Sequence, residues 1–287
     1  MAFDNLPWQS SFQSAEATDY ASKILILSKS IAEKSRCILD VAYGDDYWQK
    51  MDIYLPDDAS KKNLPVLMFA HGGGWTHGYK EWMGFMAPPI VSLPAIFASV
   101  SYRLAPVSRY PDPMRDCFSA VEWVYKNIQK FGGSPNRVFI GGHSAGGHLG
   151  SLVALRKDIT EALRLPSNVI KGCFPVSTPF DMRADNPESG SDKERLHLFL
   201  RRIEDGEEAS PICHVAGNST PFFIVCGSMD LEWVLKTTPQ MVAALKGQSG
   251  IVESHVFEGL NHFETNLALR HENNFWVKKV REWMSNF

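Results

Sequence analysis

A serine flanked by glycines is the residue of this chain best placed to do chemistry. Ser144 is the centre of a G-x-S-x-G sequence, Gly142 to Gly146, that directly follows the apolar segment 137–141. A helix-like segment comes next, so we expect the serine at a sharp turn between a strand and a helix. The glycines leave room for such a turn, and the first N–H groups of the helix can stabilise negative charge beside the serine. This context predicts a serine nucleophile.

A run of glycines after an earlier predicted strand, His71-Gly-Gly-Gly-Trp75, supplies a second part of the predicted site. Glycines let the backbone approach a ligand closely and turn its N–H groups inward. We expect the N–H groups of Gly73 and Gly74, together with that of Ala145 after the nucleophile, to form an oxyanion hole. The alternative is a flexible glycine turn. The position of the run ahead of G-x-S-x-G in the chain argues against that alternative.

An acid and a histidine follow the serine, each just after a predicted strand. Asp230 comes after the apolar segment 221–227, where its carboxylate can accept a hydrogen bond from a histidine Nδ1–H. His262 follows the last predicted strand, and the chain order Ser, Asp, His is that of the α/β-hydrolases. Because an aspartate after Gly-Ser is also common in turns and helix N-caps, Glu232 and Asp181 stay open as weaker candidates for the acid.

Together these residues predict acyl transfer through a covalent intermediate. His262 takes the proton of Ser144 as the serine attacks an acyl carbon, and then protonates the leaving alcohol or amine. Water repeats the cycle and releases the acid, so we expect neither a metal ion nor an organic cofactor. His71 and His143 are close to the serine in the chain or in the predicted fold. The first belongs to the glycine run and the second is the neighbour of Ser144, so neither aligns easily with the serine oxygen.

Apolar segments alternate with helical ones from residue 64 onward. The predicted strands are 64–70, 95–101, 137–141, 169–175, 221–227 and 251–257. The predicted helices are 113–131, a segment after Ser144, 238–246 and 272–287. This alternation predicts an α/β fold with a mostly parallel twisted sheet and helices on both faces. In such sheets the working residues gather at the carboxyl ends of the strands.

We interpret all 287 residues as a single domain with cap elements from 1–35 and 178–215. The first cap segment contains a helix from about Thr18, its expected N-cap, with apolar residues at helical spacing. Residues 36–55 are expected to form two antiparallel strands. The segment 178–215 interrupts the alternation with many charges, and we expect a lid over the strand ends, the alternative being a solvated surface excursion.

Composition and charge exclude several classes of protein. The formal net charge of −3 at pH 7 gives no indication of nucleic-acid or anionic-membrane binding. No apolar run approaches the roughly 20 residues that cross a bilayer, and the first residues lack the pattern of a secretory signal. Five cysteines without C-x-x-C spacing favour free thiols in a reducing compartment. We therefore expect a cytoplasmic protein that acts on a small molecule, with the oligomeric state, a homodimer included, left open.

Three motifs resemble the hormone-sensitive-lipase-like branch of the α/β-hydrolases. They are His71-Gly-Gly-Gly-Trp75, Tyr102-Arg-Leu-Ala-Pro106 and Gly142-His-Ser-Ala-Gly-Gly147. The resemblance runs from about residue 50 to the C-terminus and implies an α/β-hydrolase fold with the triad and oxyanion donors named above. The resemblance leaves two expectations for Trp75: its side chain faces the acyl pocket, or it packs beneath the cap. Arg103 is expected to pair with Asp112 or Asp116 and to fix the loop beneath the site.

The same branch contains both carboxylesterases and arylformamidases. Shorter motifs resemble kynurenine formamidases. They are Gly142–Gly146 with His148-Leu149, Ser210-Pro211, Asp230-Leu-Glu and His262-Phe263-Glu264. This resemblance implies hydrolysis of an N-formylkynurenine-type formamide in tryptophan catabolism. Many formamidases carry a bulkier residue at the third glycine position, here Gly74, whereas plain esterases keep glycine.

We thus predict a serine hydrolase of small acyl esters or amides, an arylformamidase in the first place and a short-chain carboxylesterase in the second. Trp75 and His143 are the predicted substrate contacts. A non-catalytic small-molecule receptor, or an interaction protein built on a decayed hydrolase, is the remote alternative from another class.

Overall fold

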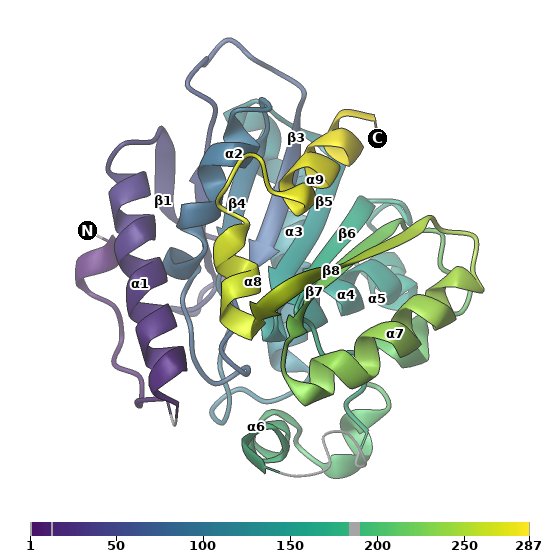
Figure 1. The fold of residues 1–287 in the computed structure, drawn as a ribbon. Coiled ribbons are helices and arrows are strands. Elements are labelled where there is room, and N and C mark those ends of the chain that lie inside the picture. The colour runs from purple at the N-terminus through teal and green to yellow at the C-terminus, as the bar shows by residue number, and fades with distance from the viewer. Residues whose placement is uncertain (1, 13, 184–189, 287) are drawn as a thin grey trace.

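One twisted sheet organises the chain in the computed structural model, which describes residues 2–12, 14–183 and 190–286 (Figure 1). In these residues eight strands pair in the order β1-β2-β4-β3-β5-β6-β7-β8. Antiparallel pairing joins β1, β2 and β4, and parallel pairing joins all the others. The strands are β1 (Cys37–Ala42), β2 (Lys50–Tyr54), β3 (Leu64–Ala70), β4 (Ile96–Val100), β5 (Gly133–His143), β6 (Ile170–Val176), β7 (Phe222–Met229) and β8 (Val252–Asn261).

Helices cover both faces of this sheet (Figure 1). One face packs against α3 (Asp112–Asn127), α4 (Ala145–Leu155), α5 (Lys157–Ala162) and α7 (Glu232–Lys246). The other face packs against α1 (Ala15–Ala32), α2 (Ala87–Val91) and α9 (Phe275–Asn286), with the short α8 (His262–Ala268) at its edge. Alternate residues of β3 divide between the two cores, with Met68 in the first and Phe69 in the second. The predicted mostly parallel sheet with helices on both faces is therefore confirmed.

Several boundaries differ from the sequence-based expectation. Helix α7 begins at Glu232 rather than at 238. Pro239, a residue type favoured in the first turn of a helix, lies in its interior. Strand β8 runs on to Asn261, and α8 forms directly after it, where no helix was expected. Helix α1 is capped by Ser14, whose Oγ accepts the Ala17 N–H at 3.3 Å, and not by Thr18.

The two segments expected to form a cap are both largely described. The first contains α1, and the second contains α6 (Gly190–Phe199) and two short 3₁₀ turns, 203–206 and 211–214. Residues 184–189 of the second segment lie outside the described residues. Within the described part of the chain, no helix combines the length and the apolar character that spanning a membrane requires.

Arg103 is held by Asp116, one of its two expected partners. The guanidinium meets the buried carboxylate through Nε and Nη2, at 2.9 and 2.7 Å, and the Arg103 N–H adds a third bond. Gln49, just before β2, donates to the same carboxylate at 2.8 Å. The alternative, Asp112, instead pairs at the surface with Arg201. This network fixes the segment that follows β4 beneath the glycine run.

Replacing Asp116 with alanine should lower the free energy of unfolding by about 2–4 kcal/mol, because it strands an arginine and two other donors that the carboxylate satisfies. Urea unfolding of the variant measures the loss. Asp112→Asn is the matched control, expected within about 1 kcal/mol of the parent because its ion pair is at the surface. Equal losses of unfolding free energy in the two variants would contradict the assignment of Asp116 as the partner of Arg103.

Candidate active site

Ser144 occupies a strained turn between β5 and α4. Its backbone angles are φ 54° and ψ −119°, in a region that side-chain-bearing residues rarely adopt. A Cβ on Gly142 would collide with the backbone of Gly146, and one on Gly146 would collide with the carbonyls of Ala70 and His71. The strand, turn and helix expected around G-x-S-x-G are thus present, and both glycines are required by close backbone packing.

The glycine run after β3 lies against this turn. A Cβ on Gly72 would come within 3.3 Å of Ser144 Cβ. The next two residues, Gly73 and Gly74, have φ values of 118° and 59° and line the same pocket as Ser144. Ala145 is the first residue of α4, and the first amides of a helix have no partner within it. The structure therefore brings the three predicted oxyanion donors to the neighbourhood of the serine.

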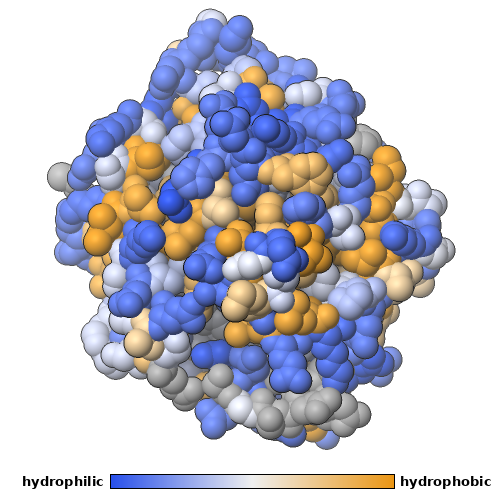
Figure 2. Space-filling model, viewed as in Figure 1, coloured by the Kyte–Doolittle hydropathy of each residue, from blue (hydrophilic) through white to orange (hydrophobic). Residues whose placement is uncertain are grey.

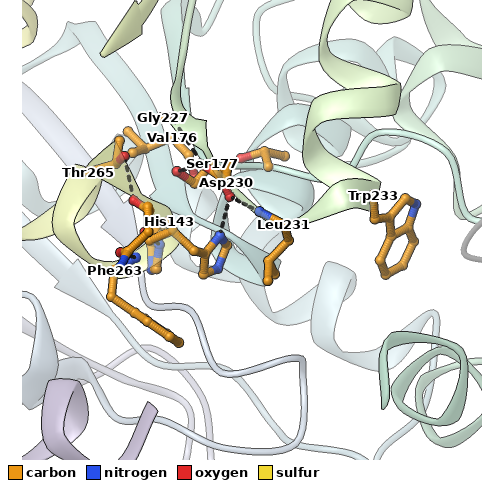
Figure 3. Close-up of polar contacts among 12 residues, drawn as sticks. His143, Val176, Ser177, Gly227, Asp230, Leu231, Trp233, Phe263 and Thr265 are labelled. Atoms are coloured by element: carbon orange, nitrogen blue, oxygen red, sulfur yellow. Dashed lines mark hydrogen bonds and ion pairs between the residues drawn. The ribbon is translucent and has the colours of Figure 1, made fainter. Parts of the chain in front are cut away.

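Asp230 and His262 form a buried hydrogen-bonded pair. His262 Nδ1 lies 2.7 Å from Asp230 Oδ1. The other carboxylate oxygen accepts from Ser177 Oγ at 2.6 Å and from the Gly227 N–H at 3.2 Å. Figure 3 shows this carboxylate between Ser177, Gly227 and Leu231, whose N–H also donates to it. Of the three acids considered from the sequence, Asp230 is therefore the one whose carboxylate contacts His262.

The charge of Asp230 is stabilised by its partners. Burial alone raises the pKa of this carboxyl, but the interaction with His262 and the hydrogen bonds from Ser177 and Gly227 outweigh it and hold the pKa below the usual range. The carboxylate thus stays ionised at neutral pH. Asp181, an alternative acid, pairs instead with Arg183 at 2.6 Å, and Glu232 begins α7.

Ser177 is a site residue that the sequence reasoning missed. It follows β6 directly, at the same edge of the sheet as Ser144 and Asp230, and its φ of 49° is in the left-handed region. Its position one residue after a buried strand is the signal that marks it, since the carboxyl ends of parallel strands meet there.

A cavity of about 210 Å³ opens above these residues. Both predicted cap segments contribute walls: Phe12, Ser14, Glu16, Ala17 and Tyr20 from the first, and Pro179, Asp192 and Arg195 from the second. The remaining lining is Trp82, Leu231, Trp233, Val234 and Phe263, with the site residues themselves. Outside the cavity, hydrophobic residues on the face in Figure 2 are interspersed with hydrophilic ones. The composition of the cavity suits a small molecule with apolar parts.

Trp75 satisfies both interpretations of its role. It lines the cavity but is only 2% exposed, and its ring stacks on Phe199 with centroids 4.5 Å apart. Its Nε1–H donates to His148 Nδ1 at 3.1 Å. The second predicted contact, His143, also lines the cavity, but its two ring nitrogens face Tyr20 and the backbone of His262. Trp75 thus forms a rigid wall of the cavity.

Three buried histidines near the site are neutral. Burial lowers the pKa of His71 and of His148 to about 4. Burial, followed by the charge of His262, also lowers the pKa of His143. His148 must carry its proton on Nε2, because this nitrogen lies 2.7 Å from the Ala209 carbonyl while Nδ1 accepts from Trp75. Among the described residues, no group of three or more His, Cys, Asp or Glu side chains is placed to hold a metal ion.

Comparison with known proteins gives the site a context. The family described as BD-FAE matches residues 51–245, more than half of the chain. Esterase LipC of Mycobacterium tuberculosis is 31% identical over 229 residues, which cover 74% of this chain and 57% of LipC. Isoprenylcysteine alpha-carbonyl methylesterase ICME of Arabidopsis thaliana is 33% identical over 239 residues, 77% of this chain and 55% of that protein. The chain spans about half the length of the curated relatives it matches.

A solved structure shows the same fold. The esterase of Pyrobaculum calidifontis superposes with a TM-score of 0.76 at 20% identity, covering 94% of this chain and 92% of that one. With the sheet order and the turn at Ser144, this likeness confirms the predicted α/β-hydrolase fold.

Stability should fall as the pH falls from about 6.5 to about 4. In this window the unfolded chain protonates histidines that the folded chain keeps neutral, so the unfolded state binds more protons and acid favours it. The lowered pKa values of His71 and His148 correspond to about 2 kcal/mol each at pH 5. Urea unfolding at pH 7, 6 and 5, with ¹H–¹⁵N spectra of the imidazoles, tests this. Unchanged stability, or charged imidazoles in the folded chain at pH 5.5, would contradict it.

Proposed function

The chain belongs to the BD-FAE family of α/β-hydrolases, and from that premise we propose that it is a serine carboxylesterase acting on short-acyl esters. The observation that carries the proposal is the 2.7 Å contact between His262 and the ionised Asp230, in a cavity that Ser144 also lines from its strained turn. Nucleophile, base and orienting acid are the three groups that acyl transfer requires.

The mechanism follows from the roles of these groups. Asp230 accepts the Nδ1–H of His262 and so leaves Nε2 free to take the proton of Ser144 Oγ as the serine attacks the ester carbonyl. The N–H groups of Gly73 and Ala145 stabilise the negative oxygen of the tetrahedral intermediate, with Gly74 as the third donor. His262 returns the proton to the leaving alcohol, and water then attacks the acyl-enzyme by the same route.

The relatives support the esterase class. LipC is named an esterase, and ICME a methylesterase. Gly74 is also consistent with an esterase, since plain esterases keep glycine at this position. A Cβ there would meet the side chain of Arg195.

One feature of the cavity favours an aromatic leaving group and so supports an arylformamidase as the second candidate. The leaving group must lie beside His262, which protonates it, and aromatic rings gather on that side. Phe263 packs on Tyr20 with centroids 4.8 Å apart, and Phe12 and Trp82 line the same cavity. A second aromatic pair, Trp75 and Trp233 with ring centroids 6.0 Å apart, lines another part of the cavity, since in Figure 3 Trp233 and Phe263 lie on opposite sides of Asp230. An aromatic wall for the leaving group suits an aryl ester or a formanilide, the bond of N-formylkynurenine.

Substitutions at the triad test the reaction class. Ser144→Ala should reduce kcat for p-nitrophenyl acetate by about 10⁴-fold or more, because it removes the nucleophile. Asp230→Asn should reduce it by about 10³- to 10⁴-fold, because an amide favours the wrong tautomer of His262. Asp181→Asn serves as the control for the acid and should stay close to the parent. Turnover that survives Ser144→Ala, or is absent from the parent, would overturn the proposal and favour a receptor.

The choice of substrate is decided by comparing kcat/KM for p-nitrophenyl acetate and N-formyl-L-kynurenine, with Ser144→Ala as the blank. We expect the ester to be preferred, because Gly74 leaves the oxyanion loop in the form that plain esterases have. A strong preference for the formamide would establish the arylformamidase instead.

A further inference from the structure

His143 connects helix α1 to the histidine of the proposed triad. Its ring lies next to that of His262, with centroids 4.7 Å apart, and only 2% of the residue is exposed. Its Nε2 is 3.1 Å from the main-chain carbonyl oxygen of His262. On the other side, its Nδ1 faces the Tyr20 hydroxyl at 3.5 Å. His143 thus spans the space between α1 and the first residue of α8.

The partners of His143 determine its proton. A carbonyl oxygen only accepts hydrogen bonds, so Nε2 must carry the hydrogen and donate it to His262 O. Because its pKa is lowered, the ring is neutral and Nδ1 is an acceptor, toward which Tyr20 can direct its O–H. Burial raises the pKa of Tyr20, so the phenol keeps that proton. A neutral His143 also leaves Asp230 to His262 and does not oppose the positive charge that His262 gains during the reaction.

Helix α1 also holds the start of α8 directly. Asn261 is the N-cap of α8, and its side-chain oxygen accepts from the N–H groups of Phe263 and Glu264. Its Nδ2 donates to Glu16 Oε1 at 2.6 Å. The Tyr20 ring packs on Phe263. Two contacts from the first turns of α1 therefore meet the residues on either side of His262.

We propose that His143 is a positioning residue for His262, and that α1 keeps it in place through Tyr20. Its Nε2–H holds the His262 carbonyl, which fixes the first turn of α8 and therefore the direction of the imidazole between Asp230 and Ser144. This proposal rests on the function proposed above. It explains why α1, which precedes the matched family region 51–245, borders the site so closely.

A pair of substitutions at one position isolates the donor. Methionine and glutamine have similar length and volume, but only glutamine carries an N–H₂ group near the place of Nε2. His143→Met should reduce kcat by about 10- to 100-fold with KM changed less than about twofold, because the base is displaced while methionine fills much of the volume of this almost fully buried side chain at the cavity wall. His143→Gln should recover most of that loss. Asp19→Asn, an exposed substitution on α1, is the control and should match the parent.

The low-field ¹H NMR signal of the His262 Nδ1–H that is bound to Asp230 gives a second readout, which does not require turnover. It should be sharp in the parent and in His143→Gln, and broadened or shifted in His143→Met. Equal kcat values in the methionine and glutamine variants, or an unaltered signal in the methionine variant, would overturn the proposal.

Tyr20→Phe keeps the ring on Phe263 and removes only the hydroxyl, so it decides the matter if His143→Met does not fold. A several-fold lower kcat at unchanged KM supports the proposal, and an unchanged kcat overturns it. A parent protein that shows the NMR signal but hydrolyses no ester contradicts the proposed function instead, so the two failures are distinguishable.

Discussion

The left-handed backbone of Ser144 is the constraint on which the rest of the site depends. Such a conformation costs on the order of 1–3 kcal/mol and persists only where the surroundings enforce it. Here the parallel ladder between β5 and β6 enforces it from one side, through the Ser144 N–H bond to Val176 at 2.8 Å. The close approach of Gly146 to the end of β3 enforces it from the other. With the turn in place, Ser144 and the first amides of α4 lie together at one edge of the sheet.

The same parallel arrangement of strands brings Asp230 and His262 together. Strands β7 and β8 are neighbours, with Gly227 opposite Phe257 and Met229 opposite Asn261, so the residues that follow them emerge side by side. Asp230 and His262 are 32 positions apart in the chain yet 2.7 Å apart in space. Burying a charged carboxylate costs free energy unless hydrogen-bond donors surround it. Ser177 and the Gly227 amide donate to this carboxylate and so hold it against His262.

The sequence allows the sheet and the positions of the candidate site residues to be predicted because both leave local signals. The apolar run Leu64–Ala70 is a strand over those same residues, and G-x-S-x-G, placed between an apolar run and a helical segment, forms the expected strand-to-helix turn. Boundaries set by tertiary contacts could not be predicted in this way. Helix α8 follows directly on a strand that continues to Asn261, and the only local signal for it is the short capping pattern of Asn261 and Glu264. The choice of Asp116 over Asp112 for Arg103 likewise depends on which carboxylate the fold buries.

The contacts of Tyr20 and His143 could not be predicted from the sequence either, because they too depend on tertiary packing. Tyr20 and His143 are separated by 123 positions, and His143 and His262 by 119. The helical spacing marks Tyr20 only as a residue of a buried face. Its place beside His262 results from how α1 packs on one face of the sheet, where Tyr20 meets Phe263 of α8 (Figure 1). The region matched to the family thus supplies Ser144 and Asp230, while segments on either side of it complete the site.

The most direct test of this account is to find which residue becomes covalently modified by a serine-directed fluorophosphonate. Intact mass and peptide mapping should show one adduct per chain, on Ser144, with labelling that is slowed strongly in His262→Ala. Because only an activated serine reacts readily with such a reagent, an unlabelled parent chain, or an adduct on another residue, would contradict the assignment of Ser144 as the nucleophile.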